Sequence, residues 1–424
     1  MKRAIVLSGG GSKGAYQIGV WKALRRLGIS YDIVTGTSVG ALNAALMVQK
    51  DYLKAVWLWY NMDFKLIFED AIEANYDTKE GKNKIYKTYA QAILDGGMNV
   101  ARLEHTVEKT LNVKKLYKSP IDFGIVTFRL KGLKPLELKK QDIPKEQLKD
   151  YLIASATCFP AFQKKKIGDS DYIDGGFYDN LPINLAIDMG ATEVIAVDLE
   201  EIGRKRKVKN KEIPITYISP NNHIGSFLVF DKMMARRCMC FGYYDTMKVY
   251  GRLDGKQYTF RKGHLKRNYD TYFSAYIQNL QHCLHFKEKD WVVENWMKIS
   301  SFRRFLVASD TKKTLEAWNH VIERLGKTFH LEECQIYDIR KWNKQLIQHY
   351  QLLEQNQIME QELKKNHFKK WFHNESMIKY LCDLMIYHPK SYQKLIHLSL
   401  FFPIEFLQAL YLKTIMGVSN EKVI

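Results

Sequence analysis

Cysteine is scarce in this sequence and is not spaced for metal binding. The 424 residues contain six cysteines, and no two of them form a CxxC pair. Structural zinc sites use closely spaced Cys and His ligands, and secreted disulfide scaffolds are short and rich in cysteine. We therefore expect no metal site, and the composition favours a reducing, cytoplasmic compartment.

Long uninterrupted apolar runs are also lacking. The N-terminal sequence MKRAIVLSGGG has basic residues, but its apolar run is short and ends in glycine, which is typical of a strand and not of a signal peptide. The stretch 395–415 is long enough to cross a membrane but contains Pro403, Glu405, Gln408 and Lys413. We expect this stretch to be amphipathic and soluble.

Acidic residues are too few to balance the basic ones. Lys and Arg number 65 against 46 Asp and Glu, which gives a formal net charge of +19. Such an excess attracts nucleic acid, a phospholipid surface or an acidic protein. No recognised nucleic-acid-binding motif accompanies the charge, so we expect no nucleic acid as a partner.

Two basic segments stand out in the sequence. The run from Arg204 to Lys211 is predicted to be an exposed loop. In the segment from Lys364 to Phe372 basic and aromatic residues interleave, which suits a membrane interface, or else a solvated helix face above packed aromatic rings.

The length and the composition predict two folded domains. A single core rarely grows beyond about 250 to 300 residues. Up to about residue 200, β-branched runs alternate with helical patterns, which predicts an α/β domain with a mostly parallel sheet covered on both faces. After Gly263 glycine is rare and apolar residues recur at helical spacing, so we expect an all-helical second domain. We place the two domains at 1–265 and 266–424.

The predicted elements alternate in the first domain. Strands are expected at 4–7, 33–35, 121–128 and 193–198, and helices at 14–27, 39–49, 100–111 and 182–189. Longer helices are expected in the second domain at 275–299, 315–325, 342–372 and 392–416.

A glycine-rich turn follows the first predicted strand, and consists of Gly9, Gly10, Gly11, Ser12, Lys13 and Gly14. The turn also matches the dinucleotide pattern GxGxxG, but Asp32 precedes the second strand, whereas a ribose-binding acid would end it. The order Lys13-Gly14 also departs from that of a phosphate-binding loop. Unobstructed N–H groups at a helix N-terminus favour an oxyanion site, and the alternative is a tight turn without a ligand.

A second turn has the pattern of a nucleophile elbow. Residues 36–40 read G-x-S-x-G between a predicted strand and a helix rich in small residues. Gly36 and Gly40 allow the chain to turn sharply, which exposes the serine at the tip. Ser38 is therefore the candidate nucleophile.

A serine nucleophile needs a base that accepts its proton, and two residues are candidates. Asp174 precedes Gly175 and Gly176, which permit a bent loop that aims the carboxylate, although Asp-Gly is also a common turn. His223 is the first histidine after the predicted sheet, as in the order of an α/β-hydrolase. The polar sequence around His223 favours an ordinary turn.

These segments together resemble the patatin-like phospholipases. Residues 8–14, 36–40 and 174–176 are similar to the family's three motifs in the same order, and 154–156, 159–160 and 180–183 are further matches. Ser8 and Lys13 depart from the Asp and Arg that the family often has. The resemblance covers about residues 1–250.

The resemblance implies a Ser–Asp dyad, with Ser38 as nucleophile and Asp174 as base. It further implies that Gly9, Gly10 and Gly11 supply backbone oxyanion donors, and that the reaction needs neither calcium nor another cofactor. The expected activity is hydrolysis of phospholipid or lysophospholipid esters to release fatty acids.

The positive charge favours anionic head groups and peripheral contact with an anionic membrane surface. The apolar stretch 56–68 is either core beneath a loop or an acyl-chain entrance. The alternative function is a non-catalytic lipid-binding or scaffolding protein that keeps the same fold.

Overall fold

Two compact units make up the chain, Met1–Tyr250 and Gly251–Ile424. The computed structural model describes residues 2–68, 78–284, 294–295, 298, 303, 311–353, 374–388 and 390–421. The units divide before residue 265, where the sequence placed the boundary. The reason is that β10 (Thr259–Arg261) pairs with β9 (Leu253–Asp254) on one side and with β11 (Ile336–Tyr337) on the other, in a sheet of the second unit.

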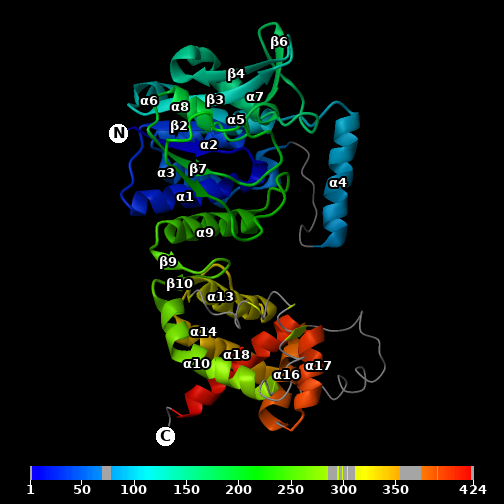
Figure 1. Ribbon diagram of the computed structural model, residues 1–424. Coiled ribbons are helices and arrows are strands. Elements are labelled where there is room, and N and C mark those ends of the chain that lie inside the picture. The colour runs from blue at the N-terminus through cyan, green and yellow to red at the C-terminus, as the bar shows by residue number, and fades with distance from the viewer. Residues whose placement is uncertain are drawn as a thin grey trace. The chain divides into compact units, whose positions relative to one another are not determined.

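An eight-stranded sheet forms the centre of the first unit (Figure 1). Its parallel part consists of β1 (Arg3–Leu7), β2 (Ile33–Thr37), β3 (Asp122–Arg129), β7 (Glu193–Val197) and β8 (Ile215–Ile218). The antiparallel strands β4 (Lys134–Lys139), β5 (Lys165–Ile167) and β6 (Ser170–Asp174) extend the sheet beyond β3. The order is β5-β6-β3-β2-β1-β7-β8, with β4 paired to β3.

Helices cover both faces of this sheet. The helices of the unit are α1 (Ala15–Arg26), α2 (Val39–Val48), α3 (Tyr52–Tyr60), α4 (Lys79–Leu94), α5 (Ala101–Thr110), α6 (Val113–Lys118), α7 (Leu148–Ser155), α8 (Ile183–Asp188) and α9 (Lys232–Val249). Ala4 and Val6 of β1 pack with Ile183 and Ala186 of α8 on one face, and α2 packs against β1, β2 and β3 on the other. The predicted α/β class, with a mostly parallel sheet between helical layers, is confirmed.

Helix α9 lies directly against α1 (Figure 1). A Cβ added to Gly19 would lie 2.0 Å from the carbonyl oxygen of Met239, and one added to Gly242 would lie 2.0 Å from that of Tyr16. Glycine on each helix is therefore what lets the two backbones touch. The Tyr16 hydroxyl donates to Asp245 Oδ2 (3.1 Å) at the same contact. The sequence patterns did not predict this helix.

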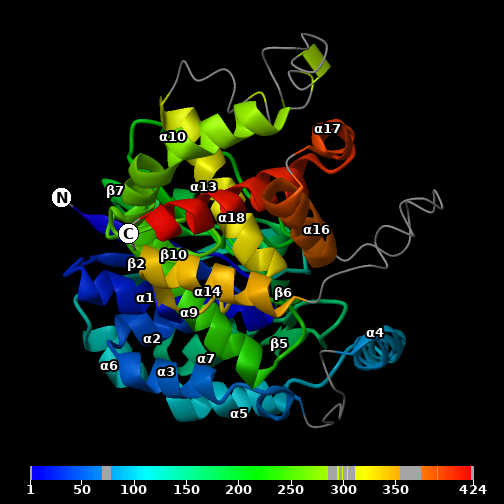
Figure 2. The same ribbon diagram turned by 90° about the horizontal axis from the view of Figure 1, so that it is seen from below.

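The second unit is a helical bundle with an aromatic core. Its longer described helices are α10 (His264–Leu284), α13 (Thr311–Thr328), α14 (Ile339–Leu352), α16 (Asn374–Tyr387), α17 (Tyr392–Phe401) and α18 (Pro403–Glu421). Helix α18 contacts all the others in this set, as Figure 2 illustrates. Trp318 and Trp342 are fully buried in the core, and the Trp318 indole N–H donates to Asn268 Oδ1 (3.0 Å). In the residues that the structure describes, the unit is helical as predicted, apart from the short strands β9, β10 and β11.

The helix predicted over 392–416 is divided in two. Pro403 begins α18, because proline has no N–H to donate within a helix but fits its first turn. Among the helices that the structure describes, none combines the length and the apolar character needed to cross a membrane. The basic and aromatic segment from Lys364 to Phe372 lies outside the described residues.

Candidate active site

Ser38 occupies the sharp turn between β2 and α2. Its backbone has φ 57° and ψ −130°, which is a strained conformation for a residue with a side chain. A Cβ on Gly36 would lie 2.4 Å from the Gly40 carbonyl oxygen, and one on Gly40 would lie 2.3 Å from the Leu7 carbonyl oxygen. Only glycine fits at either position, so the turn has the geometry of a nucleophile elbow.

Ser155 has no role predicted from the sequence, yet it holds the elbow in place. The Ser38 N–H donates to Ser155 Oγ (3.0 Å), and the Ser155 hydroxyl donates to the Val126 carbonyl oxygen in β3 (2.7 Å). Ser155 is fully buried at the end of α7. One hydroxyl that both accepts and donates thus ties the strained turn to the sheet.

Asp174 ends β6 beside the elbow serine. Ser38 lowers the pKa of the Asp174 carboxyl group, and the Gly176 N–H donates to Asp174 Oδ1 (2.7 Å). Burial raises the pKa of Asp174 to about 6, because desolvation outweighs the lowering effect of Ser38 and of the Gly176 N–H. A carboxyl group with this pKa can accept a proton at neutral pH and return it.

The other candidate base lies elsewhere. His223 is exposed and is not among the described residues that line the cavity of Ser38. Gly175 and Gly176, which follow Asp174 in the predicted motif, form the turn directly after this carboxyl group.

The glycine loop approaches Ser38 from the end of β1. Gly9, Gly10 and Gly11 line the same cavity as Ser38. The Gly9 N–H donates to the Asn180 carbonyl oxygen (3.1 Å), whereas no acceptor in the described residues pairs with the N–H of Gly10 or Gly11. Of the three predicted donors, Gly10 and Gly11 therefore have N–H groups available for a ligand, and Gly9 does not.

The remaining loop residues make structural contacts. The Ser12 N–H donates to the Phe227 carbonyl oxygen (2.8 Å). Lys13 forms an ion pair with Glu201, and Gly14 is the N-terminal cap residue of α1. These contacts fix the loop in place.

Ser38 and Asp174 face a cavity of about 630 Å³ with largely apolar walls, a volume common for small-molecule sites. The apolar lining includes Leu42, Leu46, Leu58, Met62, Leu103, Val107, Phe162 and Phe230. The sequence suggested that the stretch 56–68 is either core beneath a loop or an acyl-chain entrance. Leu58 and Met62 line the cavity, whereas Phe64 and Phe68 are buried in the core.

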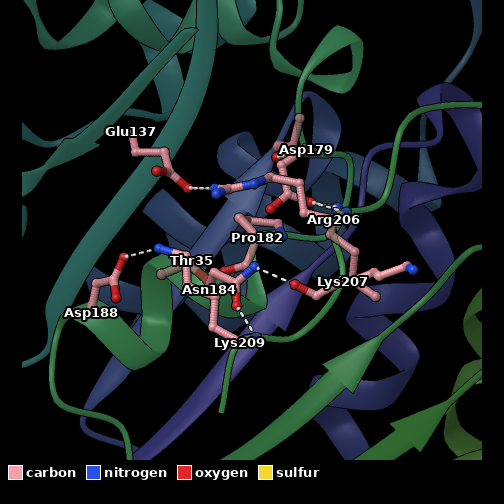
Figure 3. Close-up of polar contacts among 11 residues, drawn as sticks. Thr35, Glu137, Asp179, Pro182, Asn184, Asp188, Arg206, Lys207 and Lys209 are labelled. Carbon is pink, nitrogen blue, oxygen red and sulfur yellow. Dashed lines mark hydrogen bonds and ion pairs between the residues drawn. The ribbon is translucent and has the colours of Figure 1, made fainter. Parts of the chain in front are cut away.

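Hydroxyl groups of β2 hold the loop that follows Asp174. The Thr37 hydroxyl donates to the Asp179 carbonyl oxygen (2.7 Å), and the Thr35 hydroxyl donates to the Pro182 carbonyl oxygen (3.1 Å; Figure 3). Burial raises the pKa of the Asp179 carboxyl to about 7. Strand β2 and the loop that follows Asp174 are thus tied together.

The basic run 204–211 is mostly exposed, as predicted, but several of its charges are compensated. Arg206 pairs with Glu137 (2.9 Å; Figure 3), and Lys205 pairs with Asp198 (2.7 Å). Arg204 is exposed and lines the cavity. Part of the run therefore serves the structure around the cavity and not only its surface charge.

Asn184 of α8 fastens this run to the fold. Its Nδ2 donates to the Lys207 carbonyl oxygen (3.0 Å), and its Oδ1 accepts from the Lys209 N–H (2.9 Å; Figure 3). Asn184 is 2% exposed, and both ends of its amide are satisfied, as is usual for a buried side chain.

The elements and the site define an α/β protein with a serine elbow and a buried carboxyl group at an apolar cavity. Residues 5–187 match the family model described as patatin-like phospholipase. The matched part of the chain contains Ser38, Asp174 and the glycine loop.

Curated relatives match about half of the chain. It is 28% identical over 203 residues to patatin-like phospholipase domain-containing protein 6 of Homo sapiens, which covers 46% of this chain and 13% of that protein. Lysophospholipase NTE1 of Debaryomyces hansenii is 24% identical over 210 residues, or 47% of this chain and 12% of that protein. The chain thus spans a small part of these relatives. The crystal structure of VipD from Legionella pneumophila overlays with a TM-score of 0.39 at 12% identity, covering 98% of this chain and 91% of VipD.

Replacing Ser155 by alanine should destabilise the first unit. The substitution leaves the Ser38 N–H and the Val126 carbonyl buried without their partner, and we expect a loss of about 1–3 kcal/mol in the free energy of unfolding. Urea unfolding measures the effect, with Ser30→Ala at an exposed position as the control. Equal stability of the two variants would contradict the role of Ser155.

Proposed function

We propose that this protein is a serine lipid acyl hydrolase of the phospholipase A or lysophospholipase type, with Ser38 as nucleophile and Asp174 as base. The observation that carries the proposal is that the elbow serine Ser38 and the buried carboxyl group of Asp174 line the same apolar cavity. The patatin-like phospholipase match and a relative named lysophospholipase support a lipid ester as the substrate.

The reaction begins when Ser38 Oγ attacks the ester carbonyl carbon and its proton passes to Asp174. The N–H groups of Gly10 and Gly11 then donate to the oxyanion of the tetrahedral intermediate. As the intermediate collapses, the leaving alcohol takes the proton from Asp174 and the acyl group stays on Ser38. A water molecule, deprotonated by the same carboxylate, attacks this acyl-enzyme, and Asp174 returns the proton to Ser38 Oγ as the fatty acid leaves.

The two members of the dyad can be tested by separate substitutions. Ser38→Ala and Asp174→Asn should each lower kcat/KM for a short-chain nitrophenyl ester by at least about 1000-fold, with little change in the melting temperature. His223→Ala should keep the activity of the parent. An inactive but folded His223→Ala variant would contradict the dyad and favour a triad.

A fluorophosphonate probe distinguishes an enzyme from a lipid-binding protein of the same fold. The probe should label the parent at Ser38, as peptide mapping reads out, and should not label Asp174→Asn. Absence of labelling in the folded parent would favour the non-catalytic alternative.

The activity should also depend on pH through Asp174. The ionised carboxylate is the active base, and its pKa is raised to about 6, so protonation below that pH removes the base. We expect kcat/KM for the soluble ester to fall about tenfold per pH unit below pH 6. An unperturbed aspartate, with a pKa of about 3.9, would keep the rate constant to much lower pH. Circular dichroism at each pH checks that the protein remains folded.

A membrane surface is the proposed source of the substrate. Phe177 is 51% exposed and Ile202 is 94% exposed, and both line the cavity together with the exposed Arg204. We call these three residues the rim. Exposed apolar side chains beside a cation suit the boundary between head groups and acyl chains of an anionic bilayer.

The rim can be tested with a matched pair of substitutions. Burying an isoleucine contributes roughly 1.5 kcal/mol or more, so Ile202→Asp should reduce hydrolysis of anionic phospholipid vesicles about tenfold more than hydrolysis of a soluble ester. Leu133→Asp makes the same change at a position that is 72% exposed and is absent from the described cavity lining, and should affect neither substrate. Equal losses of Ile202→Asp on both substrates would contradict membrane contact at the rim.

A further inference from the structure

Asn180 is a buried residue of the active-site cavity whose side-chain amide lacks a hydrogen-bond partner. The residue is 3% exposed and lines the cavity. Its backbone is fully used, because its N–H donates to the Arg204 carbonyl oxygen (2.6 Å) and its carbonyl oxygen accepts from the Gly9 N–H (3.1 Å). In the part of the chain that the structure describes, nothing bonds Nδ2, and no hydrogen bond reaches Oδ1.

The end of this amide lies beside both members of the dyad. A Cβ added to Gly9 would lie 2.3 Å from Asn180 Oδ1 and 3.0 Å from Ser38 Cβ. A Cβ added to Gly176 would lie 3.1 Å from Asn180 Oδ1 and 3.1 Å from Asp174 Oδ1. Because Gly9 and Gly176 have no Cβ, the carboxamide of Asn180 can lie next to the nucleophile and the base.

Asn184 provides a direct comparison within the same segment. It is buried to the same degree, but its amide is satisfied at both ends by the backbone of Lys207 and Lys209. A buried amide without partners destabilises a folded protein, and such a group calls for an explanation such as a ligand that completes its bonds. Asn180 has the position and the unused hydrogen-bonding capacity for that purpose.

We propose that the Asn180 side-chain amide hydrogen-bonds the reacting ester of the substrate in the Ser38 cavity. This proposal rests on the hydrolase function proposed above and adds a substrate-contacting residue to it. An ester has only acceptor oxygens, so the amide must donate. Rotation of the planar amide by a half-turn places its NH₂ group where Oδ1 lies, with the same heavy-atom shape.

The bond should matter most in the transition state. The ester carbonyl oxygen gains negative charge as Ser38 attacks, and a hydrogen bond to a charged oxygen is stronger than one to a neutral oxygen. A group that binds the transition state better than the bound substrate raises kcat. Asn180 would thus act on the same oxygen as the N–H groups of Gly10 and Gly11.

The test compares Asn180→Ala and Asn184→Ala in the full chain, with a soluble nitrophenyl ester and urea unfolding. Asn180→Ala should lower kcat about 100-fold with little change in KM, and its urea midpoint should equal or exceed that of the parent. Asn184→Ala should show the opposite pattern, with a lower urea midpoint and nearly unchanged kcat per folded molecule. An Asn180→Ala variant with the kcat of the parent would overturn the proposal.

A second variant, Asn180→Leu, tests the proposal if Asn180→Ala does not fold. Asn180→Leu fills a similar space without a donor and should show the same loss of kcat, so a fully active Asn180→Leu would also overturn the proposal. The fluorophosphonate probe separates the two proposals. An unlabelled parent means that the hydrolase function itself fails. If the parent is labelled and active, and Asn180→Ala has the same kcat as the parent, only the proposed role of Asn180 fails.

Discussion

The site depends on a strained serine backbone that the sheet holds in place. Ser38 keeps its φ of 57° because β2 leads into it, two glycines clear the space around it, and the Ser155 hydroxyl links its N–H to β3. Strain of this kind persists only where the surroundings determine it. The other parts of the site are arranged around this turn.

The same sheet brings the carboxyl group to the serine. Strand β6 pairs antiparallel with β3, so that Asp174 lies opposite Thr127. Strand β3 is also the neighbour of β2, the strand that leads into Ser38. Burial at this place raises the pKa of Asp174 to about 6, which is a cost in stability when the group is ionised but a property suited to a base. The hydroxyls of Thr35 and Thr37 fix the loop beyond it.

The basic run from Arg204 to Lys211 makes structural contacts that its sequence does not reveal. Read as sequence, the residues from Arg204 to Lys211 form an anion-attracting patch. In the structure Arg206 and Lys205 have carboxylate partners, and the Arg204 carbonyl accepts from Asn180. Reversing these charges would therefore disturb the loop beside the Ser38 cavity, which is why the exposed apolar residues of the rim offer a cleaner test of membrane contact.

Local patterns in the sequence determined the strands β1, β2, β3 and β7 and the sharp turn at Ser38, because strand periodicity and glycine spacing are properties of neighbouring residues. The proposal of Asp174 as the base came from the resemblance to the patatin-like phospholipases. Only the tertiary structure decided which N–H groups of the glycine loop are free, that Ser155 supports the elbow and that the amide of Asn180 is unpaired. These features join residues far apart in the chain, such as Ser38 and Ser155 at a separation of 117 positions. No local pattern records a contact that forms only when distant strands and loops meet.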